Sequence, residues 1–229
     1  MSAADDRPVD AAEFARLMAS FEPFERAPVV AVAVSGGRDS LALAVLAHEW
    51  AIARGGRIVG LIIDHALRPE SAAEAAATEA LLGRHGCDAE TLRWVGTKPP
   101  TGLQEAARVA RYRLLREACH QRGVLHLLVA HHADDQAETV AMRAARQSGL
   151  DGLAGMAGAV ELPEVRLLRP LLGIPRSRLT ATLLARGVPW IDDPSNADPR
   201  FERARLRSGP RLTAPPVDTG RSAREQKLA

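Results

Sequence analysis

The chain has 229 residues, of which 46% are hydrophobic and 25% are charged. These fractions exclude a disordered or fibrous protein, and the length suits one large domain or two small ones. The net charge of +2 excludes no class of partner. Lys98 and Lys227 are the only lysines, so nearly all of the 30 basic residues are arginines. Arginine suits phosphate binding, but a high arginine content also arises in GC-rich genomes.

Residues 1–27 are expected to form a helical lead-in to the main domain. The first six residues, Met1 to Asp6, lack the basic start and apolar core of a secretory signal. The longest apolar stretches, such as Ala27–Val34, are too short to span a bilayer. We therefore expect no membrane attachment and a cytoplasmic location.

Short apolar runs alternate with longer helical patterns from residue 28 to residue 146. Pro28–Val34 is a continuous apolar run with four valines, as expected for a strand that is buried on both faces. We expect strands over 28–34, 57–63, 89–95 and 125–130, and helices over 39–54, 71–84, 103–122 and 134–146. Ser71 with Glu74 forms a capping-box signature at the second of these helices. The alternation predicts an α/β fold with a doubly wound parallel sheet and helices on both faces.

Beyond Gly149 the regular alternation ends. Residues 149–156 are rich in glycine and loop-like, whereas 166–172 and 176–186 suggest one further strand and one further helix. From Pro210 onward the chain is rich in Pro, Arg and Thr without periodicity, which is typical of a frayed end. The main domain is therefore expected over residues 28–208, and a basic, flexible tail over 209–229.

Polar side chains cluster directly after three of the four strands expected within 28–130. The clusters are residues 35–40, Asp64 with His65, and residues 131–138. Ligands of open parallel sheets lie outside the carboxyl ends of the strands. We therefore expect the three clusters to meet in one active site.

The loop after the first strand has the composition of a phosphate-binding loop. It reads Ser35-Gly36-Gly37-Arg38-Asp39-Ser40. Two glycines let the backbone curl closely around a phosphate, the following helix offers N–H donors, and the two serines add hydroxyl donors. Asp39 is a candidate ligand for a metal that neutralises the phosphates. The loop is neither a Walker A loop nor a GxGxxG loop, and a plain strand-to-helix turn is the alternative.

With the strand before it, this loop reads VAVSGGRDS and resembles the SGGxDS motif of the PP-loop N-type ATP pyrophosphatases. Members of that superfamily cleave ATP between the α and β phosphates, adenylate a substrate oxygen and release pyrophosphate. The resemblance implies an adenine nucleotide alpha hydrolase-like fold, with ATP bound by residues 35–40 and Mg²⁺ held by Asp39. It also implies that Asp64 and His65 lie beside the ribose or adenine of the nucleotide.

Six further motifs resemble those of one member family, the tRNA(Ile)-lysidine synthetases, and follow its order. They are DHxLR at 64–68, QExARxxRY at 104–112, HHxDDQxET at 131–139, SGLxGL at 148–153, RPLL at 169–172 and WxxDPSN at 190–196. This resemblance implies a ligase that uses ATP to adenylate the C2 oxygen of the wobble cytidine in a tRNA(Ile) with a CAU anticodon. The ε-amine of L-lysine then displaces AMP and forms lysidine.

The HHxDDQxET segment supplies acidic residues for the amine. Asp135 and Glu138 are three residues apart on a helix, and Asp134 and Glu138 are four apart, so these carboxylates can share a face. We expect Asp135 and Glu138 to receive the lysine amine, and His132 to take part in catalysis. One alternative is that these acidic residues only form a solvated first helical turn. The other is a zinc site of His131, His132 and Asp134, but the side chains of adjacent residues point apart, which argues against that site.

Arg108 and Arg111 fall in the QExARxxRY motif of the long helix at a spacing of three residues. The resemblance favours phosphate or tRNA contact and stabilisation of the leaving group, so we place both with Asp39 in the catalytic set. A solvated charged stripe is the alternative. For Arg113 and Arg116 the two interpretations are evenly balanced.

Positive charge is concentrated at the end of the chain. Residues 200–229 hold eight basic and three acidic residues, so the rest of the chain is mildly acidic. Clustered arginines are typical of contact with an RNA backbone, which makes tRNA the expected partner. Most members of the family continue into a helical domain, so we expect a catalytic domain in a short or truncated form. The oligomeric state stays open, a dimer included.

Two other functions fit part of these features. A PP-loop tRNA thiolase generally relies on CxxC pairs or persulfidable cysteines, whereas Cys87 and Cys119 lack CxxC spacing. A non-catalytic remnant that binds nucleotide or RNA is the second alternative. Incorporation of lysine into tRNA discriminates between all three functions.

Overall fold

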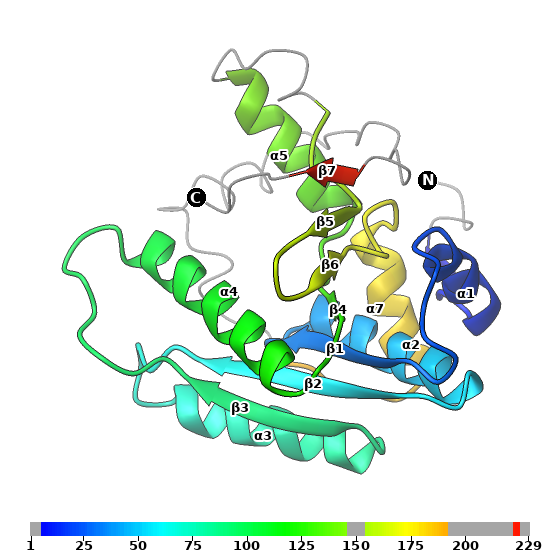
Figure 1. Ribbon diagram of the computed structural model, residues 1–229, viewed down its shortest axis with the longest axis horizontal. Helices are drawn as coiled ribbons and strands as arrows, with labels where there is room; N and C mark the ends of the chain where they lie inside the picture. Colours follow the sequence, from blue (N-terminus) through cyan, green and yellow to red (C-terminus); the bar gives the residue numbers. More distant parts are fainter. Residues whose placement is uncertain (1–5, 146–153, 192–221, 225–229) are drawn as a thin grey trace.

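The computed structural model describes residues 6–145 and 154–191, together with the backbone of residues 222–224 (Figure 1). These residues form one sheet in the order β3-β2-β1-β4-β6-β5-β7, with helices on both faces. The strands are β1 (Val29–Val34), β2 (Arg57–Asp64), β3 (Asp88–Arg93), β4 (His126–Leu128), β5 (Ala159–Glu161), β6 (Arg166–Leu168) and β7 (Ser222–Arg224). The helices are α1 (Ala11–Ala19), α2 (Arg38–Ala53), α3 (Ser71–Arg84), α4 (Leu103–Gln121), α5 (Ala133–Ala145) and α7 (Arg176–Ala185). None of the described helices is long and apolar enough to cross a membrane.

The sheet is parallel from β3 to β6. β1 lies inside the sheet and pairs with β2 and β4, so that Val30 is opposite Ile58 on one side and His126 on the other. β3 continues the parallel order beyond β2, and β6 continues it beyond β4. The doubly wound parallel sheet expected from the alternation of strands and helices is therefore confirmed.

Side chains alternate along β1 and build a hydrophobic core on each face of the sheet. Val30, Val32 and Val34 belong to the core that includes side chains of α1, α2, α3 and α7. Ala31 belongs to the second core, with Leu115 and other residues of α4. These two layers hold the carboxyl ends of β1 and β4, where the polar segments follow.

Two ion pairs tie α7 to the helices beside it. Arg178 donates to both carboxylate oxygens of Glu13 on α1, at 2.8 and 2.6 Å, and Arg186 donates to both of Glu49 on α2, at 2.7 and 2.9 Å. Phe14 of α1 is also part of the core that contains α2. The domain boundaries at residues 27 and 208 stay predictions, and the second lies outside the described residues.

The structure differs from the sequence-based expectations around β5 and β6. The expected strand over 166–172 ends at Leu168, and the sequence does not predict β5, which runs antiparallel to β6. The N–H of Leu162 donates to the carbonyl of Val165 at 3.1 Å and closes the turn between them. Three residues are too few to carry a strand period, so only the pairing with β6 identifies β5. Residues 149–153 of the expected loop and most of the tail lie outside the described residues.

Candidate active site

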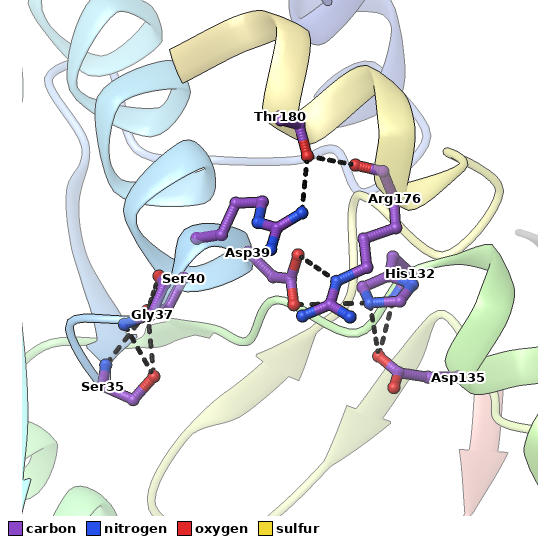
Figure 2. Close-up of polar contacts among 9 residues, drawn as sticks. Ser35, Gly37, Asp39, Ser40, His132, Asp135, Arg176 and Thr180 are labelled. Atoms are coloured by element: carbon purple, nitrogen blue, oxygen red, sulfur yellow. Dashed lines mark hydrogen bonds and ion pairs between the residues drawn. The ribbon is translucent and has the colours of Figure 1, made fainter. Parts of the chain in front are cut away.

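Residues 35–37 connect β1 to α2, and residues 38–40 form the first turn of that helix (Figure 2). The N–H of Ser35 donates to Ser40 Oγ at 3.1 Å, and Ser40 Oγ donates to the carbonyl of Gly37 at 2.9 Å. Gly37 is the N-cap residue of α2, and among the described residues no side chain caps this end of the helix. The first N–H groups of α2 are therefore available to an anion such as a phosphate.

The shape of this loop is fixed by its neighbours. Gly36 has a φ of +79°, a conformation that other residues rarely adopt, and a Cβ atom there would lie 2.4 Å from Thr78 Oγ1 of α3. The carbonyl of Gly36 accepts a hydrogen bond from the N–H of Ile191 at 3.0 Å. The guanidinium carbon of Arg38 lies 5.4 Å from the ring centroid of Trp190. The loop is thus held from α3 and from the segment that follows α7.

Four side chains of alternating charge meet at the loop (Figure 2). Arg176 Nε lies 3.3 Å from Asp39 Oδ1, and His132 Nε2 lies 3.5 Å from Asp39 Oδ2. His132 Nε2 is also 3.5 Å from Asp135 Oδ2, which accepts the backbone N–H of His132 at 3.1 Å. We call these four residues the Asp39 cluster. Two of the three polar segments expected to converge, 35–40 and 131–138, therefore do so.

The surroundings of Asp39 and of His132 favour the charged form of each. Burial alone would raise the pKa of Asp39, but the hydrogen bond and charge of His132, followed by the charge of Arg176, hold that pKa below its usual value. Burial also opposes protonation of His132, which is 1% exposed, yet Asp39 and Asp135 raise its pKa above the usual value. When protonated, His132 balances two carboxylates in a site where water screens charges poorly.

Helix α5 separates its acidic residues. Asp134 is exposed, whereas Asp135 lies in the Asp39 cluster and Glu138 is only 3% exposed. Between them, the buried amide of Gln136 accepts the N–H of Met156 at 2.6 Å and donates to its carbonyl at 3.0 Å. Asp135 and Glu138 therefore lie on the inner side of α5, and Asp134 does not share that position.

Asp64 stabilises the turn that follows β2. It is 4% exposed, and its Oδ1 accepts the N–H of Ala66 at 2.8 Å and the hydroxyl of Ser71 at 2.7 Å. Burial would raise the pKa of Asp64, but the bonds from Ser71 and Ala66 lower it. The capping box expected of Ser71 and Glu74 is wrong, because α3 has no side-chain cap among the described residues and the Ser71 hydroxyl is bound to Asp64. Asp64 thus contacts its own turn and Arg93 of β3, whose Nε lies 3.6 Å from Asp64 Oδ2, rather than the Asp39 cluster.

A second group of cations surrounds Tyr112 of α4. The guanidinium carbons of Arg108 and Arg111 lie 5.3 and 5.1 Å from the ring centroid of Tyr112. Burial would raise the pKa of Tyr112, but the charges of Arg111, Arg108 and Arg169 lower it. Arg169 is only 5% exposed, and its Nε donates to Nδ1 of His131 at 3.1 Å. This group therefore adjoins the Asp39 cluster through the two consecutive histidines.

The arginines of α4 differ in their counter-charges. Arg113 and Arg116 form ion pairs with glutamates at 3.0 and 2.6 Å, whereas Arg108 and Arg111 have none within the described part of the chain. Burial and the charge of Arg111 also lower the pKa of His65, which favours its neutral form. In the described part of the chain no carboxylate pairs with Arg108 or Arg111, and this arrangement favours binding of an anion.

A metal ion at Asp39 would take its other ligands from water or from the substrate. Within residues 6–145 and 154–191, no group of three or more His, Cys, Asp or Glu side chains is arranged to hold a metal ion. Mg²⁺ is commonly bound by one or two carboxylates together with substrate phosphates. The position of Asp39 at the start of α2, beside the uncapped N–H groups, fits that kind of site.

Sequence reasoning finds three of the four members of the Asp39 cluster and misses Arg176. That residue lies 137 positions from Asp39 and begins a helix whose sequence carries no site motif. Arg169 belongs to the RPLL motif, but nothing in its spacing reveals its bond to His131. Tertiary packing brings these residues together, because α7 lies against α2 and β6 pairs with β4.

Comparisons with known proteins agree with this arrangement. A family model described as a PP-loop domain matches residues 9–210. The chain is 50% identical over 221 residues to a tRNA(Ile)-lysidine synthase of Rhodopseudomonas palustris, covering 95% of this chain and 63% of the relative. It is 48% identical over 206 residues to a protein of the same name from a Bradyrhizobium species, covering 89% of this chain and 57% of the relative. The chain thus spans less than two thirds of the length of either.

Among solved structures, the chain resembles the U34-tRNA thiolase NcsA from Methanococcus maripaludis. The TM-score is 0.69 at 18% sequence identity, and the match covers 86% of this chain and 71% of that protein. At this identity the likeness concerns the fold alone. Together with the match to the PP-loop domain, it confirms the expected adenine nucleotide alpha hydrolase-like fold.

Proposed function

This chain belongs to the PP-loop domain family, and we propose that it uses ATP to join L-lysine to the wobble cytidine of a tRNA(Ile) with a CAU anticodon. The two relatives above, both named tRNA(Ile)-lysidine synthase, support this proposal. The observation that carries it is the Asp39 cluster. There Asp39 of the phosphate-binding loop meets Asp135 through His132, so a nucleotide and an amine can be oriented in one site.

ATP binding is assigned to residues 35–40 and the start of α2. The absence of a side chain at Gly36 and the uncapped N–H groups of α2 suit phosphates, and the hydroxyls of Ser35 and Ser40 lie 3.1 Å apart beside them. Asp39 would hold Mg²⁺ together with the phosphates. When bound, the ion supplies positive charge that neutralises them. Asp64 and His65 are assigned to the ribose or adenine side.

Asp135 and Glu138 are assigned to the lysine amine. Both lie on the inner side of α5, and His132 orients Asp135 through its backbone N–H and its ring. A carboxylate can pair with the ammonium group and then accept the proton that the amine must lose before it attacks. Two carboxylates at this position therefore suit both binding and deprotonation of lysine.

Contact with tRNA is assigned to Arg108 and Arg111. Their guanidinium groups have no acidic partner within the described residues, and arginine binds phosphate oxygens well. The basic residues 200–229 are a second candidate contact. Most of that segment lies outside the described residues, so its part stays a prediction.

The thiolase alternative requires a reactive cysteine near the nucleotide. Cys87 directly precedes β3 and Cys119 lies near the end of α4, so both are at the amino ends of the strands, opposite the edge that holds the Asp39 cluster. Burial raises the pKa of Cys87 to about 11 and that of Cys119 to about 12. Buried, protonated thiols at the amino ends of the strands, away from the assigned nucleotide site, do not support transfer of sulfur.

The partial reactions test the proposed ligase. Wild-type chain should release pyrophosphate from ATP only when the CAU transcript is present, and should release AMP only when L-lysine is then added. Asp39→Ala should abolish release of pyrophosphate. Retained nucleotide binding without any release would favour the non-catalytic remnant, and release that depends on a sulfur donor instead of lysine would favour the thiolase.

A further inference from the structure

Arg176 belongs to the Asp39 cluster but has no role in the function proposed above. It is the first residue of α7, and its Nε donates to Asp39 Oδ1 at 3.3 Å. Within the described parts of the chain, its two terminal nitrogens make no hydrogen bond. Most of the hydrogen-bonding capacity of this guanidinium is therefore not used by the described residues, beside the loop assigned to the phosphates (Figure 2).

The arginines nearest to Arg176 are used differently. Arg178, two residues later, binds Glu13 through both terminal nitrogens and faces α1. Arg38, at the start of α2, donates instead to Thr180 Oγ1 of α7 at 3.0 Å. Of these three arginines, Arg176 is the one that contacts the carboxylate of Asp39.

Asp39 cannot hold Arg176 and a metal ion at once without strong repulsion between the two cations. The metal that accompanies ATP would therefore displace the guanidinium from the carboxylate. The phosphates provide a new partner at the same place, because guanidinium binds phosphate oxygens through two parallel hydrogen bonds. The loop 35–40 lies on the phosphate side of the assigned nucleotide site, away from Asp64 and His65.

We infer that Arg176 is a phosphate-contacting residue, which pairs with Asp39 in the free protein and moves to the β and γ phosphates when Mg·ATP binds. This inference rests on the use of ATP proposed above. In that position the guanidinium stabilises the negative charge of the departing pyrophosphate. Asp39 is released at the same time and can take the metal.

Calorimetric titration with Mg·ATP, Mg·pyrophosphate and AMP tests this inference. Arg176→Met should bind Mg·ATP and Mg·pyrophosphate about tenfold more weakly or worse, the loss typical of a charge-assisted hydrogen-bonding group, and should bind AMP as wild type does. Arg176→Lys should retain most of the affinity. Arg178→Met is the matched control, because it removes an arginine of the same helix that binds Glu13, and it should leave all three affinities unchanged.

Three results would overturn the inference. The first is an unchanged affinity of Arg176→Met for Mg·ATP, and the second is a loss of affinity for AMP equal to that for Mg·ATP. The third is that the wild type binds none of the three phosphate compounds, a result that would also overturn the proposed use of ATP. Failure to attach lysine to tRNA, with the expected binding pattern intact, would instead overturn only the proposed ligase function.

Binding of Mn²⁺ without nucleotide supplies a second readout. Arg176 competes with a metal ion for Asp39 in the free protein, so Arg176→Met should bind Mn²⁺ several times more tightly than wild type in a titration followed by electron paramagnetic resonance. Equal or weaker binding would contradict the exchange of partners at Asp39. Arg178→Met should match the wild type.

Discussion

Replacing Gly36 with alanine tests whether contact with α3 fixes the shape of the loop 35–40. A φ of +79° is unfavourable for a residue with a Cβ atom, by about 1–2 kcal/mol. The new Cβ would lie 2.4 Å from Thr78 Oγ1, so that hydroxyl must move. Thr78 is buried, and its hydroxyl donates to the carbonyl of Glu74 at 2.9 Å, a bond that the movement would break.

Loss of a buried hydrogen bond costs about 1–3 kcal/mol. Together with the backbone conformation, Gly36→Ala should lower the free energy of unfolding by about 2–5 kcal/mol. The affinity for Mg·ATP should fall as well, because the loop carries the phosphate site. In a double variant with Thr78→Ala, the nearest side-chain atom of residue 78 would be its Cβ at 3.6 Å, so the clash is removed but the backbone strain is not. The double variant should therefore lose less than the sum of the two single changes.

Urea unfolding and calorimetric titration measure these effects. Gly83→Ala is the control, because Gly83 lies in the same helix as Thr78, has no positive φ, and has no described atom within 4 Å of its added Cβ. Helix propensity predicts a gain of up to about 1 kcal/mol for that change. If the free energy of unfolding of Gly36→Ala lies within about 0.5 kcal/mol of the wild-type value and its affinity for Mg·ATP is unchanged, Thr78 does not constrain the loop.

Changes at Ile191, at the two cysteines and at Arg178 test other features of the molecule. Ile191→Pro removes the N–H that donates to the carbonyl of Gly36, so this change should weaken binding of Mg·ATP. Ile191→Ala keeps the N–H and should leave the affinity unchanged. Equal effects of the two changes would assign the contact to the side chain. Replacing both Cys87 and Cys119 with alanine should leave the rate of lysine attachment unchanged, and a lost reaction in a folded variant would revive the thiolase. Arg178→Met should lower the free energy of unfolding by about 1.5–3 kcal/mol near neutral pH. Because Arg178 holds the pKa of Glu13 below its usual value, this difference should vanish as the pH falls through that lowered pKa; a constant difference in urea unfolding would contradict the ion pair.

The loop and its sheet were predictable because their signals are local. The valine run of β1 and the six residues that follow it are adjacent in sequence, and the alternation of strands and helices determines a parallel sheet. Since the carboxyl ends of parallel strands share an edge, the meeting of Asp39 with His132 and Asp135 follows from the strand order.

The remaining features depend on tertiary contacts that no spacing encodes. Arg176 is one arginine among many, and it meets Asp39 only because α7 packs on α2. Ser71 and Glu74 have the spacing of a capping box, but the buried carboxylate of Asp64 takes the hydroxyl instead. A buried carboxylate needs its hydrogen bonds more than an exposed helix end needs a cap.

Attachment of lysine to tRNA tests the central claim most directly. The chain would be incubated with ATP, radiolabelled L-lysine and unmodified tRNA(Ile) transcripts that carry either cytidine or uridine at the wobble position. We predict label in the cytidine transcript alone, dependent on ATP and lost in Asp39→Ala. Label in neither transcript, or equal label in both, would contradict the account.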